Sequence, residues 1–314
     1  MEFGLISRIR SRIAARGDVA LGIGDDAAVL RVPAGQELVV AMDTLNAGVH
    51  FFEDAAAADI GWKSLAVNLS DLAAMGAEPA WCTLSLSLPS PDADWVDGFL
   101  DGFLALAAGH GVALVGGDTT RGPLSVCVTA HGLVDAGRAL RRDGARVGDE
   151  VWVTGTPGDA AAALSALSAG DAPEPALRRR LERPEPRIAA GLALRGLAGA
   201  CIDVSDGLLA DLGHVCTASG VGAVIELERL PVSKALADFP AQVRWPWQAA
   251  GGDDYELCFT AAAGRGEAVE RALAAAGVAA TRIGRIVEGG GVRAVDPAGA
   301  PWRPARTGFE HFGD

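Results

Sequence analysis

The stretch CIDVSDGLLA (201–210) contains the pattern that decides the fold prediction. An apolar run ends in Asp203 and Asp206, and a helix is predicted to begin near Leu208. Apolar runs tipped by aspartates recur in GIGDD (22–26), AMD (41–43), NLSD (68–71), VGGD (115–118) and GGDD (251–254). Carboxylates that follow buried strands and converge on one crevice repel one another unless cations lie between them. The pattern therefore favours an α/β fold with a Mg²⁺ site, and Mg²⁺ held by carboxylates and water usually serves phosphates.

Both halves of the chain mix predicted strands and helices. In the first half we expect a helix over 5–15, a buried strand over 38–42 that ends at Asp43, a helix over 59–75, a strand over 81–88, a helix over 92–109, a strand over 112–116, the loop GGDTTRG and a strand over 125–132. In the second half we expect a strand over 150–155, a helix over 158–167, an exposed connection over 171–187, a helix from about 208, a tight loop and strand over 251–260 and a helix over 265–276. The charged, glycine-rich composition of 136–150 predicts a connection between two domains, 1–137 and 138–314.

The helix predicted over 59–75 has two distinct stripes. Its apolar face carries Trp62, Leu65, Ala66, Leu69 and Leu72, and Gly76 is its predicted C-cap. Ser64, Asn68 and Asp71 fall on another stripe, so Asp71 faces polar surroundings. Taken singly, that stripe is typical of a solvated helix face.

The net charge of −13 argues against nucleic acid or an anionic membrane as the default partner. The longest apolar stretch, 95–117, is interrupted by Asp97, Asp101 and His110, so no membrane span is predicted. The five cysteines are widely spaced in apolar stretches, which is typical of buried reduced thiols. We expect a cytoplasmic protein.

Each acid-bearing motif also has an ordinary explanation. GIGDD and GGD are common turns, and Asp43 fits an N-cap or turn. The strongest motif is DVSDG (203–207), with two acids and a hydroxyl at a strand-to-helix junction whose free N–H groups attract phosphate. GGDTTRG adds hydroxyls and Arg121, a guanidinium suited to phosphate. His50, in a loop beside Gly48 and Phe51, is the histidine expected to contact ligand. The sequence contains no P-loop motif and no protein-kinase HRD or DFG motif.

The strings GIGDDAAVL, MDTLNAGVHF, GWKSLAVNLSDLAAMGAEP, VGGDTTRG, IDVSDGL, GGDDYELCF and GFEHF, spread from Phe3 to Phe312, resemble the bacterial thiamine-monophosphate kinases. That family belongs to the superfamily of aminoimidazole ribonucleotide synthetase. The resemblance implies a two-domain, mixed α/β fold of the aminoimidazole ribonucleotide synthetase type. It also implies a homodimer formed through the N-terminal sheet, with active sites in clefts between the domains. The N-terminal domain would bind ATP and metal, and the C-terminal domain would complete the site.

The resemblance also implies roles for individual residues. The magnesium carboxylates would be Asp26, Asp43, Asp71, Asp118, Asp203 and Asp206, while Asp25 and Asp254 are secondary. Gly117, Asp118, Arg142 and Ser205 would contact ATP, and His50, Asp253 and Phe309 would line the thiamine monophosphate pocket. Three residues depart from the family pattern. Met42 stands where a hydroxyl residue is frequent, Leu100 replaces a tyrosine, and Asp253 is one methylene shorter than the usual glutamate.

The implied reaction converts thiamine monophosphate and ATP into thiamine diphosphate with several Mg²⁺ ions. The acceptor oxygen is already anionic near neutral pH, so we expect no general base and direct in-line transfer without a phosphoenzyme. One alternative is another enzyme of the superfamily. Selenophosphate synthetases use a cysteine or selenocysteine near the N-terminus, but the first cysteine here is Cys82. Hydrogenase-maturation proteins end in a cysteine, whereas this chain ends in Phe-Gly-Asp. The other alternative is a non-catalytic protein that binds divalent metal or nucleotide.

Overall fold

The computed structural model describes residues 8–311, which form two compact units. The first unit comprises the chain up to Leu72 together with Ala77–Gly137. The second unit comprises Ala73–Gly76 and the chain from Arg138 onward.

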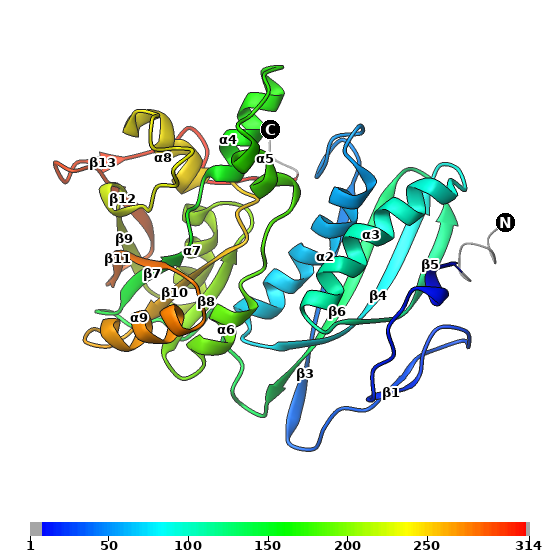
Figure 1. The fold of residues 1–314 in the computed structure, drawn as a ribbon. Helices are drawn as coiled ribbons and strands as arrows, with labels where there is room; N and C mark the ends of the chain where they lie inside the picture. The colour runs from blue at the N-terminus through cyan, green and yellow to red at the C-terminus, as the bar shows by residue number, and fades with distance from the viewer. Residues whose placement is uncertain (1–7, 312–314) are drawn as a thin grey trace. The chain divides into compact units, whose positions relative to one another are not determined.

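The first unit is built on a four-stranded sheet in the order β3-β6-β4-β5 (Figure 1). Its strands are β3 (Gln36–Asn46), β4 (Glu78–Leu88), β5 (Ala113–Arg121) and β6 (Ser125–Asp135), and β1 (Val19–Leu21) pairs separately with β2 (Val29–Leu30). Helices α2 (Ala57–Ala74) and α3 (Ala93–Gly109) lie side by side over the sheet. Because α3 connects β4 to β5, these two strands pair in parallel, and the other pairings in this sheet are antiparallel.

Glycines let α2 and α3 approach closely. A Cβ atom on Gly61 would collide with the carbonyl oxygen of Phe99, and one on Gly102 would collide with that of Ala58. The Asp92 carboxylate caps α3 by accepting hydrogen bonds from the N–H groups of Asp94 and Trp95, each at 3.0 Å. The polar side of α2 is therefore held at a fixed position in this unit.

Two acid-bearing strands of the first unit run further than the sequence predicts. β3 continues past Asp43 to Asn46, and its residues Leu38, Val40 and Met42 are exposed, so the prediction of a buried strand ending at Asp43 is wrong. β3 lies at the edge of the sheet, and the alternating burial along it shows that the side chains of Leu38, Val40 and Met42 share its exposed face. The segment predicted as the loop GGDTTRG continues β5 as far as Arg121, with Asp118 opposite Ser85 of β4. Asp43 and Asp118 thus stand within strands rather than beyond their ends.

The second unit contains a seven-stranded sheet in the order β13-β12-β9-β11-β7-β10-β8. Its strands are β7 (Glu150–Thr154), β8 (Ala198–Val204), β9 (Gly222–Glu226), β10 (Glu256–Ala261), β11 (Ala280–Val287), β12 (Gly291–Val295) and β13 (Pro301–Trp302). Its helices are α4 (Asp159–Ser168), α5 (Pro175–Glu182), α6 (Ile188–Leu194), α7 (Leu208–Ser219), α8 (Ala241–Ala250), α9 (Gly266–Ala275) and the 3-10 turn η1 (Leu227–Arg229). Only β12 and β9 pair in parallel among the described strands of this sheet.

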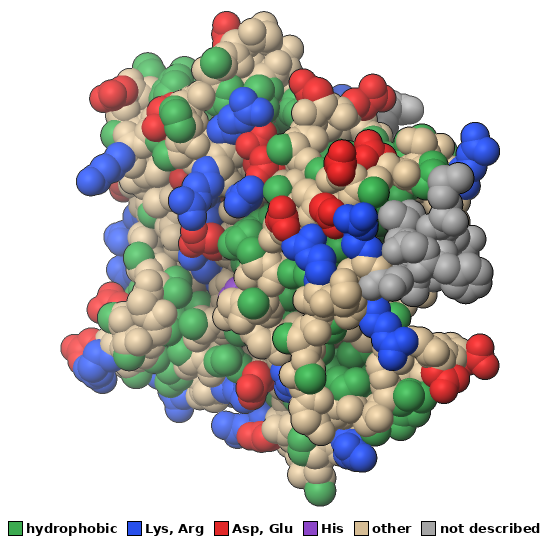
Figure 2. All heavy atoms as spheres, turned by 45° about the vertical axis from the view of Figure 1, so that its right-hand side comes forward, with side chains coloured by type: hydrophobic (Ala, Val, Ile, Leu, Met, Phe, Trp, Pro, Cys, Tyr) green, Lys and Arg blue, Asp and Glu red, His purple; other side chains and the backbone are tan. Residues whose placement is uncertain are grey.

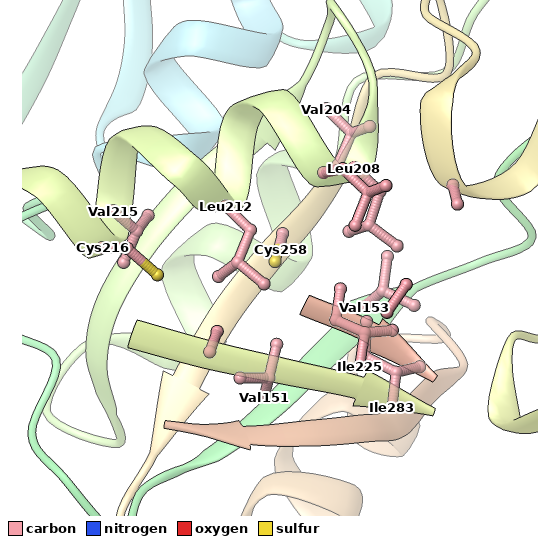
Figure 3. Packing of buried hydrophobic residues seen from close by; sticks show 14 of the residues in the cluster. Val151, Val153, Val204, Leu208, Leu212, Val215, Cys216, Ile225, Cys258 and Ile283 are labelled. Atoms are coloured by element: carbon pink, nitrogen blue, oxygen red, sulfur yellow. The ribbon is translucent and has the colours of Figure 1, made fainter. Parts of the chain in front are cut away.

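Helix α7 packs on this sheet through an apolar cluster. Leu208, Leu212 and Val215 of α7 lie over Val151 of β7 and Cys258 of β10 (Figure 3). All five side chains are buried. Such burial stabilises by about 25 cal/mol per Å² of apolar surface. The predicted helix start near Leu208 is confirmed, and the packing fixes the preceding loop relative to the sheet.

Two other predictions need correction. The connection predicted over 171–187 contains α5, and its residues Arg180 and Arg187 are largely buried because both pair with Glu256. The N-terminal helix predicted over 5–15 is helical at 8–11 only, and residues 5–7 lie outside the described part of the chain. After the helix, the Arg16 guanidinium donates a hydrogen bond to the Gly111 carbonyl at 2.6 Å, which anchors this stretch without helical structure.

Among the described residues, no helix is long and apolar enough to cross a membrane. Basic and acidic side chains are interspersed over the face of the molecule in Figure 2. All five cysteines are free thiols, and four of them are buried.

Candidate active site

In the first unit, Asn68 links the polar side of α2 to Asp43. Its side-chain oxygen accepts a hydrogen bond from the Asp43 N–H at 3.0 Å, and its amide donates to the Ser64 carbonyl at 3.0 Å. Ser64 and Asn68 are fully buried, so this stripe is not a solvated helix face. Asp71 continues the same stripe and is half-buried. The stripe predicted from helical spacing therefore has a structural function, because Asn68 of this stripe holds the β3 backbone at Asp43.

Two more predicted acids of this unit, Asp26 and Asp118, are exposed. Gly117 and Asp118 line a recess of about 90 Å³ together with Ile23, which belongs to the GIGDD loop. A Cβ atom on Gly117, whose φ is +153°, would collide with the Leu84 carbonyl, so only glycine fits at this step of β5. The glycine brings the strand backbone, and with it Asp118, next to the loop that carries Asp26.

His50 is held by backbone contacts on both sides. Its Nδ1 accepts a hydrogen bond from the Asn46 N–H at 3.0 Å, and its carbonyl accepts one from the Lys63 ammonium at 3.2 Å. Lys63 is nearly fully buried on α2. Because Nδ1 accepts a hydrogen bond, Nε2 is the protonated nitrogen of the neutral ring.

In the second unit, the predicted DVSDG motif forms the end of β8 and the loop into α7. Asp203 lies in β8 and is almost fully buried, while Ser205 and Asp206 are half-buried. A fourth residue, Asp211 in the first turn of α7, turns its carboxylate back onto this loop. Its Oδ2 accepts hydrogen bonds from the N–H groups of Ser205, Asp206 and Gly207 at 3.1, 3.1 and 3.0 Å.

These three hydrogen bonds correct one expectation. The free N–H groups at the start of the helix were predicted to attract phosphate, and those of the three residues just before it, 205–207, donate to Asp211 instead. The Ser205 hydroxyl and the Asp206 carboxylate are the groups of this loop that can serve a ligand. The position of Asp211 four residues after Gly207 was a readable signal, because acids in the first turn of a helix commonly cap it.

Negative charge is concentrated at this loop. Burial, with further contributions from the Asp203 and Asp206 carboxylates, raises the pKa of Asp211 to about 7. Ligand atoms of Asp206, Asp211 and His214 lie within 4.8 Å of one another. A divalent cation near the Asp203 and Asp206 carboxylates would offset their mutual repulsion, and carboxylate oxygens suit a hard ion such as Mg²⁺.

The GGDD motif packs directly against the DVSDG loop. The Asp253 N–H donates to the Ser205 carbonyl and the Tyr255 N–H donates to the Val204 carbonyl, each at 2.8 Å. Asp253 and Tyr255 both adopt left-handed backbone conformations, with φ of 67° and 51°. Such conformations cost about 1–3 kcal/mol each and occur most often at functional sites. The Tyr255 hydroxyl donates to Asp253 Oδ1 at 3.0 Å, which orients the carboxylate assigned to substrate.

Beneath this loop lies a buried charged cluster that the sequence did not predict. Glu256 is fully buried and accepts hydrogen bonds from Arg180, Arg187 and the Thr154 hydroxyl at 2.6–2.7 Å. Burial by itself would raise the pKa of Glu256, but the two arginines outweigh it and hold that pKa below its ordinary value. Asp254 accepts from the Gly158 N–H at 2.9 Å, and its burial raises its pKa well above the ordinary value.

Two further predicted residues join the second-unit loops. The Phe309 N–H donates to the Asp206 carbonyl at 3.0 Å, and the exposed Phe309 ring packs edge-on against His311 at 4.9 Å between centroids. Phe312, the last residue of GFEHF, lies outside the described residues. Arg142 is exposed next to Arg141, whose carbonyl accepts the Cys201 N–H of β8 at 2.9 Å.

The structure thus groups the predicted residues by unit. Ser205, Asp206, Asp253 and Phe309 are joined by backbone hydrogen bonds in the second unit. In the first unit, Asp43 is joined to the stripe that carries Asp71, and Asp118 shares a recess with the GIGDD loop. Of the departures, Leu100 is a fully buried core residue of α3 and Met42 is exposed on β3.

Known families match both units. Residues 24–134 match the family "AIR synthase related protein, N-terminal domain", and residues 146–297 match its C-terminal domain. The thiamine-monophosphate kinase of Salmonella typhimurium is 47% identical over 324 residues, covering 99% of this chain and 98% of that protein. The chain belongs to the thiamine-monophosphate kinase family.

Solved structures of this family have the same fold. The crystal structure of the thiamine-monophosphate kinase from Stenotrophomonas maltophilia is 54% identical, with a TM-score of 0.88, and covers 93% of this chain and 96% of that one. The structure of AaThiL complexed with AMPPCP and TMP is 33% identical, with a TM-score of 0.78, and covers 99% and 97% of the two chains. The expected two-domain, mixed α/β fold is confirmed, and family membership excludes assignment to the selenophosphate synthetases or hydrogenase-maturation proteins.

Proposed function

We propose that this chain transfers the γ-phosphoryl group of ATP to thiamine monophosphate, which yields thiamine diphosphate and ADP. The similarity to thiamine-monophosphate kinases over 99% of the chain carries this proposal. The related structure with AMPPCP and TMP supports an ATP-like nucleotide and thiamine monophosphate as the two ligands. In the second unit, backbone hydrogen bonds join Ser205, Asp206, Asp253 and Phe309, to which the resemblance gives nucleotide, metal and substrate roles.

We further propose that Mg²⁺ is the metal cofactor and that the carboxylates Asp26, Asp43, Asp71, Asp118, Asp203 and Asp206 hold several ions. The concentration of acids around Asp203, Asp206 and Asp211 supports a divalent cation in the second unit. When bound, Mg²⁺ screens the repulsion between the two phosphate groups and stabilises charge on the transferring phosphoryl group.

The protein's own residues then bind and orient the two substrates. Gly117 and Asp118 of β5, the Ser205 hydroxyl and the Arg142 guanidinium would contact ATP. His50, Asp253 and Phe309 would contact thiamine monophosphate, with Asp253 oriented by Tyr255 and with the exposed Phe309 ring offering an aromatic face. The attacking phosphate oxygen is anionic without help, so positioning supplies most of the catalysis and no side chain has to act as a general base.

The roles of the two domains, 1–137 and 138–314, follow from this distribution. We assign ATP and metal binding and dimerisation to the first domain, and completion of the site to the second. Leu38, Val40 and Met42 form an exposed apolar row on the edge strand β3, which supports a homodimer made through this sheet. Val40→Glu would then convert the dimer to a monomer in light scattering after size exclusion. The free, mostly buried cysteines are consistent with the reducing cytoplasm as the site of action.

Product analysis with Mg-ATP and thiamine monophosphate tests the function. Wild-type protein should form thiamine diphosphate, and Asp71→Asn should lose most of that activity. Asp94→Asn, an exposed acid in the first turn of α3, is the matched control and should retain it. Intact ATP binding without turnover would support the non-catalytic alternative. Label from γ-³²P-ATP retained on the protein without acceptor would overturn direct in-line transfer.

A further inference from the structure

Asp211 holds the backbone of the DVSDG loop through three hydrogen bonds. It is 3% exposed, and one oxygen atom accepts from three consecutive backbone N–H groups, those of Ser205, Asp206 and Gly207. Because one oxygen atom accepts all three N–H groups, this contact fixes the path of the loop backbone over three successive residues.

Asp211 is itself firmly attached to the sheet. Its N–H donates to the Gly207 carbonyl at 2.9 Å, which closes the first turn of α7. On either side of it, Leu208 and Leu212 are fully buried in the cluster between α7 and the sheet (Figure 3). A rigid helix therefore holds the Asp211 carboxylate in place, and the carboxylate in turn holds the backbone of residues 205–207.

The loop residues held in this way are those with roles in the proposed transfer. Asp211 fixes the N–H groups of Ser205 and Asp206, while the carbonyls of the same two residues accept the N–H groups of Asp253 and Phe309. A shift of this backbone would displace the Ser205 hydroxyl, the Asp206 carboxylate and both substrate-side residues together.

We propose that Asp211 is a positioning residue. By holding the backbone of residues 205–206, it sets the direction in which the Ser205 hydroxyl and the Asp206 carboxylate face Mg-nucleotide. The proposal rests on the proposed function. Its structural basis is the geometry of one carboxylate oxygen that gathers three successive N–H groups at the start of α7.

Two substitutions that keep a polar side chain at this position separate positioning from metal ligation. Asp211→Asn loses the charge but keeps an oxygen at the same distance from the helix, which can still accept the three N–H groups. Asp211→Glu keeps the charge but adds a methylene, which pushes the loop away from the helix. Positioning predicts that Asn retains activity within about threefold, whereas Glu loses about 10- to 100-fold in kcat and needs more Mg²⁺ for half-saturation. Ligation of metal by Asp211, with Asp206 and His214, predicts the opposite order, and that order would overturn the proposal.

A matched control distinguishes positioning from a contribution to stability alone. Asp149 is another buried acid of the second unit that accepts a backbone N–H, that of Arg146, at 2.9 Å. Asp149→Ala should lower Tm but leave kcat and the Mg²⁺ requirement unchanged. Asp211→Ala should alter both whenever it folds, and unchanged values in folded Asp211→Ala or Asp211→Glu would contradict positioning.

Titration calorimetry with Mg-ADP keeps this inference separate from the proposed function. Weaker Mg-ADP binding in Asp211→Glu than in Asp211→Asn is expected even when turnover is not measured. A wild-type protein without thiamine monophosphate kinase activity would overturn the function alone, while equal Mg-ADP binding by the two variants would overturn the positioning role alone.

Discussion

The two units hold their acids in opposite ways. In the first unit, Asp26 and Asp118 are exposed to water on a loop and a strand. In the second unit, Asp203, Asp211, Asp254 and Glu256 are at most 4% exposed and lie among backbone N–H groups and arginines. Exposed carboxylates cost little on folding, whereas buried ones must be offset by partners. The second unit therefore holds these acids rigidly at a cost in stability, whereas Asp26 and Asp118 of the first unit stay hydrated.

The largest expected effect is the difference between a buried and an exposed acid in both kcat/KM and Tm. Asp203→Asn should lower kcat/KM by about 10³-fold, as expected when a preorganised charge is removed, and it should shift Tm because the side chain is buried among polar partners. Asp118→Asn should lower kcat/KM with Tm unchanged. Steady-state assays and thermal melts of both variants measure the contrast. An unchanged Tm for Asp203→Asn would contradict it.

The buried acids Glu256 and Asp254 should also make the free energy of unfolding depend on pH, unlike exposed acids. The folded-state pKa of Glu256 is lowered, so its contribution to stability is present above about pH 4.5 and is lost as the pH falls further. Glu256→Gln leaves Arg180 and Arg187 without their buried carboxylate and should cost about 3–5 kcal/mol at pH 7, with a smaller difference in acid. Denaturant unfolding from pH 4 to pH 8 measures it.

The contribution of Asp254 to stability should have the opposite pH dependence. Its folded-state pKa is raised well above 3.8, so its favourable contribution is complete below that pH and decreases as the pH rises. Asp254→Asn keeps an acceptor for the Gly158 N–H without the charge, and its stability relative to wild type should improve from pH 4 to pH 8. Parallel pH trends for the Glu256→Gln and Asp254→Asn differences would refute the distinction between the two acids.

The sequence predicts the acids better than it predicts what holds them. Asp43, Asp118 and Asp203 follow from their place in or after apolar runs, and α7 follows from helical periodicity. Strand lengths were missed, because Gly117 and Asp118 look like a turn until pairing with β4 is known. The Glu256 cluster was also missed, since its arginines lie about 70 residues away in a polar segment typical of an exposed connection. Long-range charge pairing leaves no local signal.

A smaller effect is expected from Asn68, whose side-chain oxygen accepts the Asp43 N–H in the first unit. Asn68→Ala removes the acceptor of the Asp43 N–H and should lower kcat/KM about 10-fold by loosening Asp43 against α2. Ser64→Ala is the matched control, because the Ser64 hydroxyl donates to Gly61 within the same helix. A kinetic loss as large in Ser64→Ala as in Asn68→Ala would show that α2 packing, rather than the link to Asp43, is responsible.

The smallest expected effect concerns the Tyr255 hydroxyl. Tyr255→Phe keeps the buried ring and removes the donor to Asp253 Oδ1, so the carboxylate should remain in the site but lose its fixed direction. KM for thiamine monophosphate should rise about 3- to 10-fold, the size expected for an ordinary net hydrogen-bond contribution of about 0.5–1.5 kcal/mol, with kcat and Tm nearly unchanged. Asp253→Asn, which removes the charge itself, should raise the same KM further. If Tyr255→Phe instead lowered kcat at constant KM, Asp253 would act in the transfer step, and the second unit's preorganisation would extend to the transition state.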